Sequence, residues 1–298
     1  MPNILDIRRR IRSVKNTQQI TRAMKMVAAA RLRRAVERVL NARPYANQLR
    51  AMLASVAART AERSHPLLAT RPVEKVLLVL VTADRGLCGA FNSNLIRAAQ
   101  GYLAEHRGLK VSMLCVGRKG RDFFRKHGVA MPAEYVNISA RLDYAQAQEI
   151  AERIRELYAT EAVDAVDVVY NEYKSALVQR LTVERFLPIA PIGPAAGAPS
   201  PVPQTRDGAQ GASLMDYIYE QPPEELFKAL LYRYADVEVY RALVESAAAE
   251  LAAKMTAMDA ATENASEMID HLTLTMNCIR QAAITKEIIE IVSGGAGV

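Results

Sequence analysis

The spacing of apolar residues predicts an amphipathic helix at the start of the chain. Apolar residues recur there every three or four positions and would form one stripe along the helix. Polar residues interrupt the stripe once, at Gln18, Thr21 and Lys25. The apolar members are Ile4, Ile7, Ile11, Val14, Ala28, Leu32, Ala35 and Val39. Proline lacks the amide hydrogen that a helix interior needs, so Pro44 either kinks this helix or starts a second one over 45–58. Residues 1–59 form the first predicted helical segment.

Residues 222–298 form the second predicted helical segment, which is unusually long. Neither proline nor glycine occurs between Pro223 and Val292, and one helix of that extent would be ~105 Å long. Its apolar residues keep two seven-residue series over about five repeats, as in a coiled coil. The series are Leu251, Met258, Ala265, Leu272 and Ile279, and Met255, Thr262, Ile269, Met276 and Ala283.

The pattern changes near Ala283, where both series stop. Charged residues, Lys286 and Glu290, stand at the next seven-residue steps. A different apolar stripe then follows on another side of the helix, formed by Ile284, Ile288, Ile291 and Val292. We therefore expect the helix to lie against its own chain before Ala283 and to present an apolar tip to another protein after it.

The middle of the chain has the pattern of an α/β domain over 73–187. A continuous apolar run at 75–82 is typical of a strand buried on both faces, and 179–187 alternates as an edge strand does. Strands and helices alternate, which predicts a Rossmann-like, mostly parallel sheet covered by helices. The expected strands are 75–82, 110–116, 165–170 and 179–187, and the expected helices are 91–106, 118–126 and 142–158. A linker over 188–221 follows, because 188–211 contains six prolines and four glycines.

Charge is divided between the two helical segments. Residues 1–43 contain twelve Lys and Arg residues against two acids, whereas 222–292 contain six against twelve acids. A basic helix alone would suggest nucleic acid, but a basic helix and an acidic helix in one chain indicate that the two pair. Three widely spaced cysteines suggest neither a disulfide framework nor a zinc site. The apolar runs are too short for a membrane span, and no signal-peptide core is recognised.

Residues that could take part in catalysis or in ligand binding are few and far apart in the sequence. The loop 82–92 lies where α/β folds bind phosphate, but it lacks both common phosphate-binding glycine motifs. We expect a tight turn there, with Asp84 hydrogen-bonded to local backbone. The four histidines are far apart in sequence, and His271 is expected to be solvated beside the helical seam. Asp164 and Asp167 flank a predicted strand and are interpreted as edge charges rather than a catalytic pair.

Several stretches resemble the gamma subunits of F-type ATP synthases, in the order expected for that family. They are residues 7–30, 84–92, 240–247, 254–259 and 282–290, so the resemblance extends over nearly the whole chain. It implies an antiparallel coiled coil of the N- and C-terminal helices together with the α/β domain. It further implies a central rotary shaft that couples rotation of a c-ring to conformational cycling of catalytic beta subunits. The expected partners are alpha, beta, epsilon and possibly delta subunits and the c-ring, with neither cofactor, metal nor catalytic residue in this chain.

The resemblance also implies roles for particular residues. Contacts to alpha and beta subunits are expected from Met24, Lys25, Arg280, Gln281, Thr285 and Glu287. An apolar bearing is expected from Ile284, Ile288, Ile291 and Val292. Contacts to the c-ring and epsilon are expected at a foot formed by Arg233, Tyr234, Asp236, Glu238 and Tyr240. The expected location is the cytoplasmic face of a bacterial inner membrane, as a peripheral protein.

Two other functions are compatible with parts of the sequence. The basic first 43 residues would suit a nucleic-acid-binding coiled coil, which predicts salt-sensitive DNA binding. The loop 84–89 would suit a nucleotide hydrolase, which predicts turnover by the isolated chain. Neither alternative explains the acidic partner helix or the apolar tip.

Overall fold

The computed structural model describes residues 4–57, 65–138, 142–189 and 223–295. These residues divide into two compact units. One unit contains Met1–Leu32, Leu87–Gly89 and Leu251–Val298, and the other contains Arg33–Gly86 and Ala90–Glu250. We call them the helical-pair unit and the sheet unit. Most of the expected linker, residues 190–221, lies outside the described residues.

The sheet unit is built on five strands in the order β3-β2-β1-β4-β5. Strand β1 pairs in parallel with β2 and β4, β2 pairs in parallel with β3, and β5 pairs antiparallel with β4 at the edge. The strands are β1 (Lys75–Val81), β2 (Lys110–Val116), β3 (Ala133–Tyr135), β4 (Ala165–Tyr173) and β5 (Gln179–Leu187). The four expected strands are therefore present, and the short β3 is an addition that the pattern did not predict.

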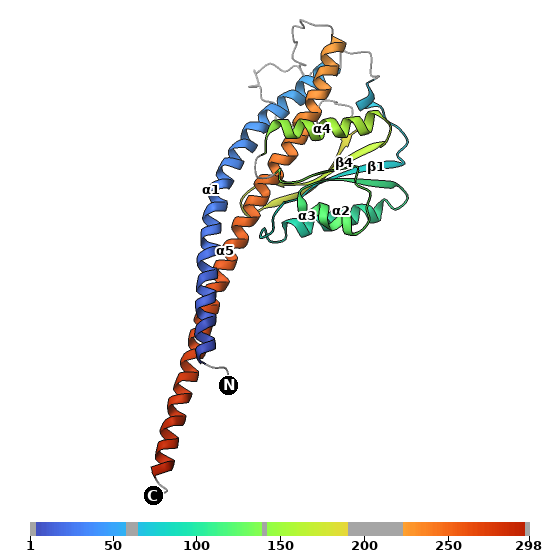
Figure 1. Cartoon of the computed structure of the whole chain (residues 1–298). Helices are drawn as coiled ribbons and strands as arrows, with labels where there is room; N and C mark the ends of the chain where they lie inside the picture. Colours follow the sequence, from blue (N-terminus) through green and yellow to red (C-terminus); the bar gives the residue numbers. More distant parts are fainter. Residues whose placement is uncertain (1–3, 58–64, 139–141, 190–222, 296–298) are drawn as a thin grey trace, which may run out of the picture. The chain divides into compact units, whose positions relative to one another are not determined.

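Helices cover both faces of this sheet, as Figure 1 shows. One face bears α2 (Phe91–Glu105) and α3 (Arg118–Lys126), and the other bears α4 (Tyr144–Ala159). Successive side chains along β1 point to opposite faces of the sheet. Leu77, Val79 and Val81 belong to the cluster that also holds Ile150 and Ile154 of α4. A short 3-10 helix, η1 (Pro66–Leu68), adds Leu67 to that cluster.

Two long helices contribute to both units. Helix α1 runs from Ile4 to Ala57 and helix α5 from Pro223 to Gly295. Pro44 lies inside α1, so the alternative of a second helix starting after it is wrong. The physical reason is packing: Ala46, Leu49 and Leu53 directly after Pro44 are buried in the core of the sheet unit, which outweighs the lost backbone hydrogen bond.

Candidate functional site: the helical pair, the foot and the first strand turn

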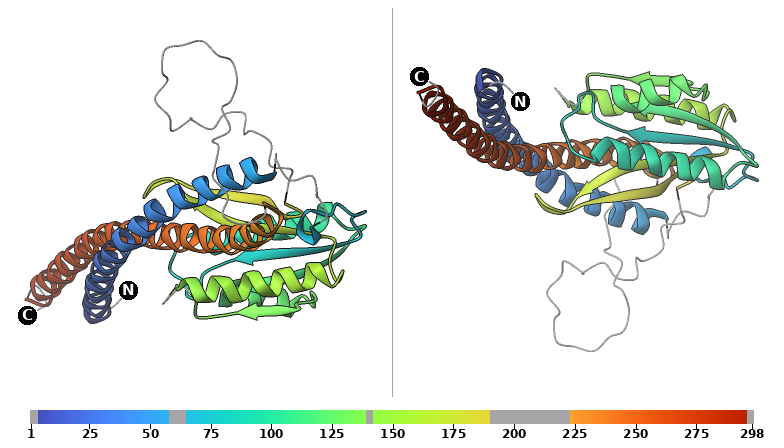
Figure 2. Two further views of the ribbon diagram at one scale, coloured as in Figure 1. Left: turned by 90° about the horizontal axis from the view of Figure 1, so that it is seen from above. Right: turned by 90° about the horizontal axis from the view of Figure 1, so that it is seen from below.

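In the helical-pair unit, α1 and α5 are joined by two polar contacts that set their direction. Thr21 Oγ1 lies 2.8 Å from Thr262 Oγ1, and Lys25 Nζ donates to Asp259 Oδ1 at 2.5 Å. The residue number rises along α1 while it falls along α5. The two helices are therefore antiparallel, and the further views of Figure 2 show them crossing each other.

The seven-residue series in α5 form the seam of this pair. All ten members are buried or half-buried, including Met258 and Ala265 at 5% and 7% exposure. On α1, the buried residues Ile7, Ala28 and Leu32 belong to the predicted stripe. The heptad prediction is thus confirmed by the burial of its members.

Beyond Ala283 the character of α5 changes, as the sequence pattern predicts. Every residue from Ile284 to Ile289 is exposed, and so is Ile291. Ile288 and Ile291 expose 54% and 73% of their surface. In the antiparallel register, the start of α1 lies opposite about residue 279, and Figure 1 shows α5 continuing past it. The side chain of Val292 lies outside the described residues.

The polar residues expected to contact alpha and beta subunits lie on this unit in two groups. Arg280, Gln281, Thr285 and Glu287 are exposed on α5 near its end, and the Thr285 hydroxyl donates to the Gln281 carbonyl at 2.9 Å. Met24 and Lys25 are half-buried on α1. His271 is exposed, as expected.

The five expected foot residues lie in the sheet unit, on the first part of α5. Arg233 is exposed, donates to the Tyr45 hydroxyl at 3.3 Å and lies over the Tyr144 ring at 4.9 Å. Tyr240 is half-buried and meets Tyr144 edge-on. Tyr234, Asp236 and Glu238 are buried, with 8%, 6% and 8% exposure.

The buried foot carboxylates are paired with arginines of the same unit. Asp236 accepts from Arg155 of α4. Glu238 lies 3.4 Å from Arg50 and 2.7 Å from Arg241. Although burial opposes a charged Arg241, Glu238 holds the pKa of that guanidinium above its ordinary value. Sequence reasoning missed the pairs with Arg50 and Arg155, because their members are 188 and 81 residues apart. The Glu238–Arg241 pair has i,i+3 spacing on one helix, a signal that could have indicated it.

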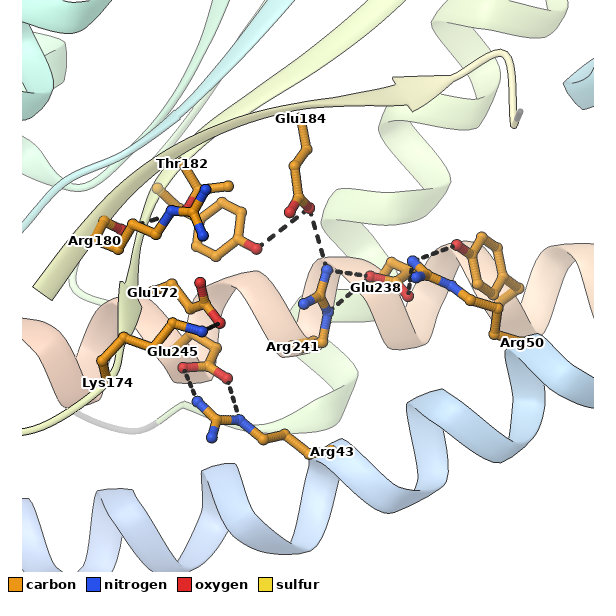
Figure 3. A network of polar contacts seen from close by, with 12 residues as sticks. Arg43, Arg50, Glu172, Lys174, Arg180, Thr182, Glu184, Glu238, Arg241 and Glu245 are labelled. Atoms are coloured by element: carbon orange, nitrogen blue, oxygen red, sulfur yellow. Dashed lines mark hydrogen bonds and ion pairs between the residues drawn. The ribbon is translucent and has the colours of Figure 1, made fainter. Parts of the chain in front are cut away.

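Figure 3 shows how these ion pairs continue into the sheet. Arg241 also donates to Glu184 of β5 at 3.2 Å, and Glu184 accepts from the Tyr170 hydroxyl of β4 at 3.3 Å. Beside them, Arg43 of α1 donates to both carboxylate oxygens of Glu245, at 2.8 and 3.0 Å. Hydrogen bonding to Glu245 raises the pKa of Arg43.

The turn after β1 accepts hydrogen bonds from the backbone at the start of α3, the helix that follows β2. A helix leaves its first four amide groups without partners in the helix, yet all four at the start of α3 are satisfied. Gly117 N donates to the Tyr135 carbonyl at 2.7 Å, and Lys119 N donates to the Ala83 carbonyl at 3.2 Å. Arg118 N donates to Asp84 Oδ1 at 3.1 Å, and Gly120 N donates to Thr82 Oγ1 at 2.9 Å.

We expected Asp84 to bind the backbone of its own tight turn. It does accept from a backbone amide group, but this partner, Arg118 N, is 34 residues away in sequence at the start of α3. Its Oδ1 atom also accepts from Asn137 N at 2.8 Å. A helix N-terminus binds a phosphate through free amide groups, and at α3 protein oxygens occupy that position. The helix that follows the loop 82–92 is α2, whose N-cap residue Ala90 makes no side-chain capping bond. Among the described residues, no group of three or more His, Cys, Asp or Glu side chains is arranged to hold a metal ion.

The interpretation of Asp167 as an edge charge is wrong. Asp167 lies within β4 with 4% exposure, accepts from Tyr102 of α2, and pairs with Arg185 of β5 at 2.5 Å. Burial of the Tyr102 hydroxyl and its bond to Asp167 raise the pKa of that tyrosine. Asp164 instead accepts from the amide groups of Glu74 and Lys75, at 3.1 and 2.9 Å. Both carboxylates have structural partners.

The architecture defines a class of protein in which two terminal helices pair with each other and an α/β unit lies between them in sequence. Comparison with known proteins identifies the class. A family model described as ATP synthase matches residues 3–298. The chain is 52% identical to the ATP synthase gamma chain of Solibacter usitatus, over 99% of both chains. It is 46% identical to that of Chlorobaculum parvum, over 99% of this chain and 98% of the other.

Solved structures agree with this assignment. A chain of the central stalk and c-ring structure of Tetrahymena thermophila mitochondrial ATP synthase has a TM-score of 0.59 at 27% identity, and the match covers 81% of this chain and 99% of that one. A chain of the Euglena gracilis mitochondrial enzyme shares the fold, with a TM-score of 0.66 at 21% identity over 99% and 94% of the two chains. The chain belongs to the ATP synthase gamma-chain family.

Proposed function

We propose that this chain is the central rotary shaft of a proton-translocating F-type ATP synthase. It couples rotation of the c-ring to conformational cycling of the catalytic beta subunits, and it supplies no catalytic group itself. Its partners are the alpha, beta and epsilon subunits, with delta as a further candidate, and the c-ring. The observation that carries the proposal is the antiparallel seam of α1 and α5, which ends where an exposed apolar stretch of α5 begins.

A paired shaft suits this work because a shaft must resist twisting. Each elementary charge that crosses 100 mV supplies ~2.3 kcal/mol, and several act before one product leaves. Side-chain pairs within a single helix contribute only a few tenths of a kcal/mol each. Two helices joined along a seam distribute the load over many buried contacts, so the pair resists twisting more than one helix would.

The end of α5 is the proposed bearing. Ile284, Ile288 and Ile291 present exposed apolar surface, and Val292 continues the stripe in sequence. A surrounding collar of alpha and beta subunits would cover them without fixed polar contacts. Arg280, Gln281, Thr285 and Glu287 on this stretch, and Met24 and Lys25 on α1, would make intermittent polar contacts with the same subunits.

The proposed foot comprises 233–240. Arg233 is its exposed cation and Tyr240 is partly accessible, so these two would meet epsilon or the c-ring directly. Tyr234, Asp236 and Glu238 would support that surface from inside, through their bonds to Arg50, Arg155 and Arg241.

The proposed location is the cytoplasmic face of a bacterial inner membrane, where the chain would be a peripheral component of the membrane-bound enzyme. In the part of the chain that the structure describes, every helix is too short or too polar to cross a bilayer. Attachment would therefore run through the c-ring.

Co-expression with alpha and beta subunits tests the proposal. We expect a stable complex that hydrolyses ATP and contains one copy of this chain. The Gln281→Ala/Thr285→Ala double variant should impair assembly or proton-driven synthesis. Unchanged synthesis by that variant would reject the assigned contacts, whereas failure of the wild-type chain to join alpha and beta would reject the function.

A further inference from the structure

Two arginine–glutamate pairs in the sheet unit join the same two helices at equivalent positions. Arg43 and Arg50 are seven residues apart on α1, and their partners Glu245 and Glu238 are seven residues apart on α5. Residues seven apart lie on the same side of a helix, two turns from each other. Figure 3 shows both pairs bridging α1 and α5.

The first pair also binds the sheet. Arg43 Nη2 donates to the Tyr173 carbonyl at 2.7 Å, and Tyr173 N donates to Glu245 Oε2 at 3.0 Å. The Glu245 side chain is 2% exposed, so its charge depends on these donors for solvation. Helix α1, helix α5 and the end of strand β4 therefore meet at one buried carboxylate.

The second pair reaches the neighbouring edge strand. Glu238 binds both Arg50 and Arg241, and Arg241 donates to Glu184 of β5. The two pairs thus connect both helices to both strands of the β4–β5 hairpin.

Small apolar side chains form part of the buried surface of α5 in this region. They are Ala235, Val237, Val239, Ala242, Val244, Ala248 and Ala249. Burial of apolar area is non-directional, so these side chains constrain the alignment of the helices less than ion pairs of fixed geometry do. The larger buried residues of the same stretch are Phe227, Leu231, Tyr234 and Leu243.

We propose that the Arg43–Glu245 and Arg50–Glu238 pairs are a register lock for α1 and α5. A slip by one turn separates both pairs at once and leaves the buried Glu245 carboxylate without Arg43. A slip by one heptad re-forms at most one pair and separates the other. Buried polar groups that specify helix alignment at a cost in stability are well documented in coiled coils. The inference concerns the alignment of two helices and holds whether or not the chain is a rotary shaft.

Spin-label distances in the full-length chain test the lock. Labels at Asn47→Cys on α1 and Lys228→Cys on α5 occupy exposed positions of the sheet unit, with the exposed Cys278 replaced by serine. With both ion pairs intact, the two spin labels should give one narrow distribution of distances. Arg43→Met/Glu245→Leu should keep the chain folded but add or shift a distance by roughly 5 Å, one helical turn.

A matched control and a second variant make the result decisive. Arg153→Met/Glu156→Leu removes an exposed pair within α4 and should leave the distance unchanged. A single narrow wild-type distance in the Arg43→Met/Glu245→Leu variant would overturn the lock. If that variant does not fold, Glu245→Gln decides: a broadened distance supports the lock, and the wild-type distribution overturns it.

Discussion

At the scale of single residues, Gly117 shows how closely the turn after β2 packs on the end of β1. Its φ angle is 102°, and a Cβ atom there would lie 2.1 Å from the Thr82 carbonyl oxygen. Gly117→Ala should lower the free energy of unfolding by ~2 kcal/mol or more, because the strained backbone and the clash add. Urea denaturation measures the free energy of unfolding. The control is Gly108→Ala, where a Cβ atom would meet no atom within 4 Å, and it should change the free energy of unfolding little.

His65 makes stability depend on pH. Its ring Nδ1 accepts from Leu67 N at 3.2 Å, it is 6% exposed, and burial together with Lys228 lowers its pKa below the ordinary 6.5. The unfolded chain therefore binds the proton first as pH falls. This contribution to stability is complete above pH 6.5 and is lost as pH falls from there through the folded-state pKa. His65→Asn should flatten that part of the stability profile in denaturation series across pH, and an unchanged slope would contradict the assignment.

Residue roles were predictable from sequence where they depend on the helix that carries the residue, as the exposure of His271 shows. The partners of Asp84 and Asp167 were not predictable. Asp84 accepts from the amide groups of Arg118 and Asn137. Asp167 is reached by Tyr102 from α2 and by Arg185 from β5. Sequence spacing does not encode such contacts across a sheet.

At the scale of elements, the seam of α1 and α5 includes one ion pair, Lys25–Asp259, whose contribution to stability can be measured. Lys25 and Asp259 are 40% and 60% exposed, so their attraction contributes at most about 1 kcal/mol. Lys25→Asp and Asp259→Lys should each lower the melting temperature of the full-length chain slightly through like-charge contact. The double exchange should restore it. Additive losses in the double variant would show that the pair is not an energetic contact.

Periodicity predicted the long helices, the main strands and the end of the seam, because each is set by a repeating burial pattern. It did not predict β3, whose three residues are too few to show a period. It also left the course of the chain at Pro44 open, since tertiary packing after the proline decides whether the helix continues.

At the scale of the whole molecule, a substitution at an exposed isoleucine of α5 should affect assembly with other subunits without changing the stability of the chain. Ile288→Asp should leave the melting temperature of the isolated chain unchanged, because this side chain is 54% exposed there. In the membrane-bound enzyme, a carboxylate placed against an apolar collar of alpha and beta subunits should be costly. We expect at least a several-fold loss of ATP-driven proton pumping or of assembly. Full pumping by this variant would exclude a bearing at Ile288.

The bonds of Asp84 have a consequence for how the loops of the sheet unit move. From the turn after β1, this one carboxylate accepts from the start of α3 and from the backbone after β3. Torque that reaches this end of the sheet would therefore act on segments that move as one group rather than separately.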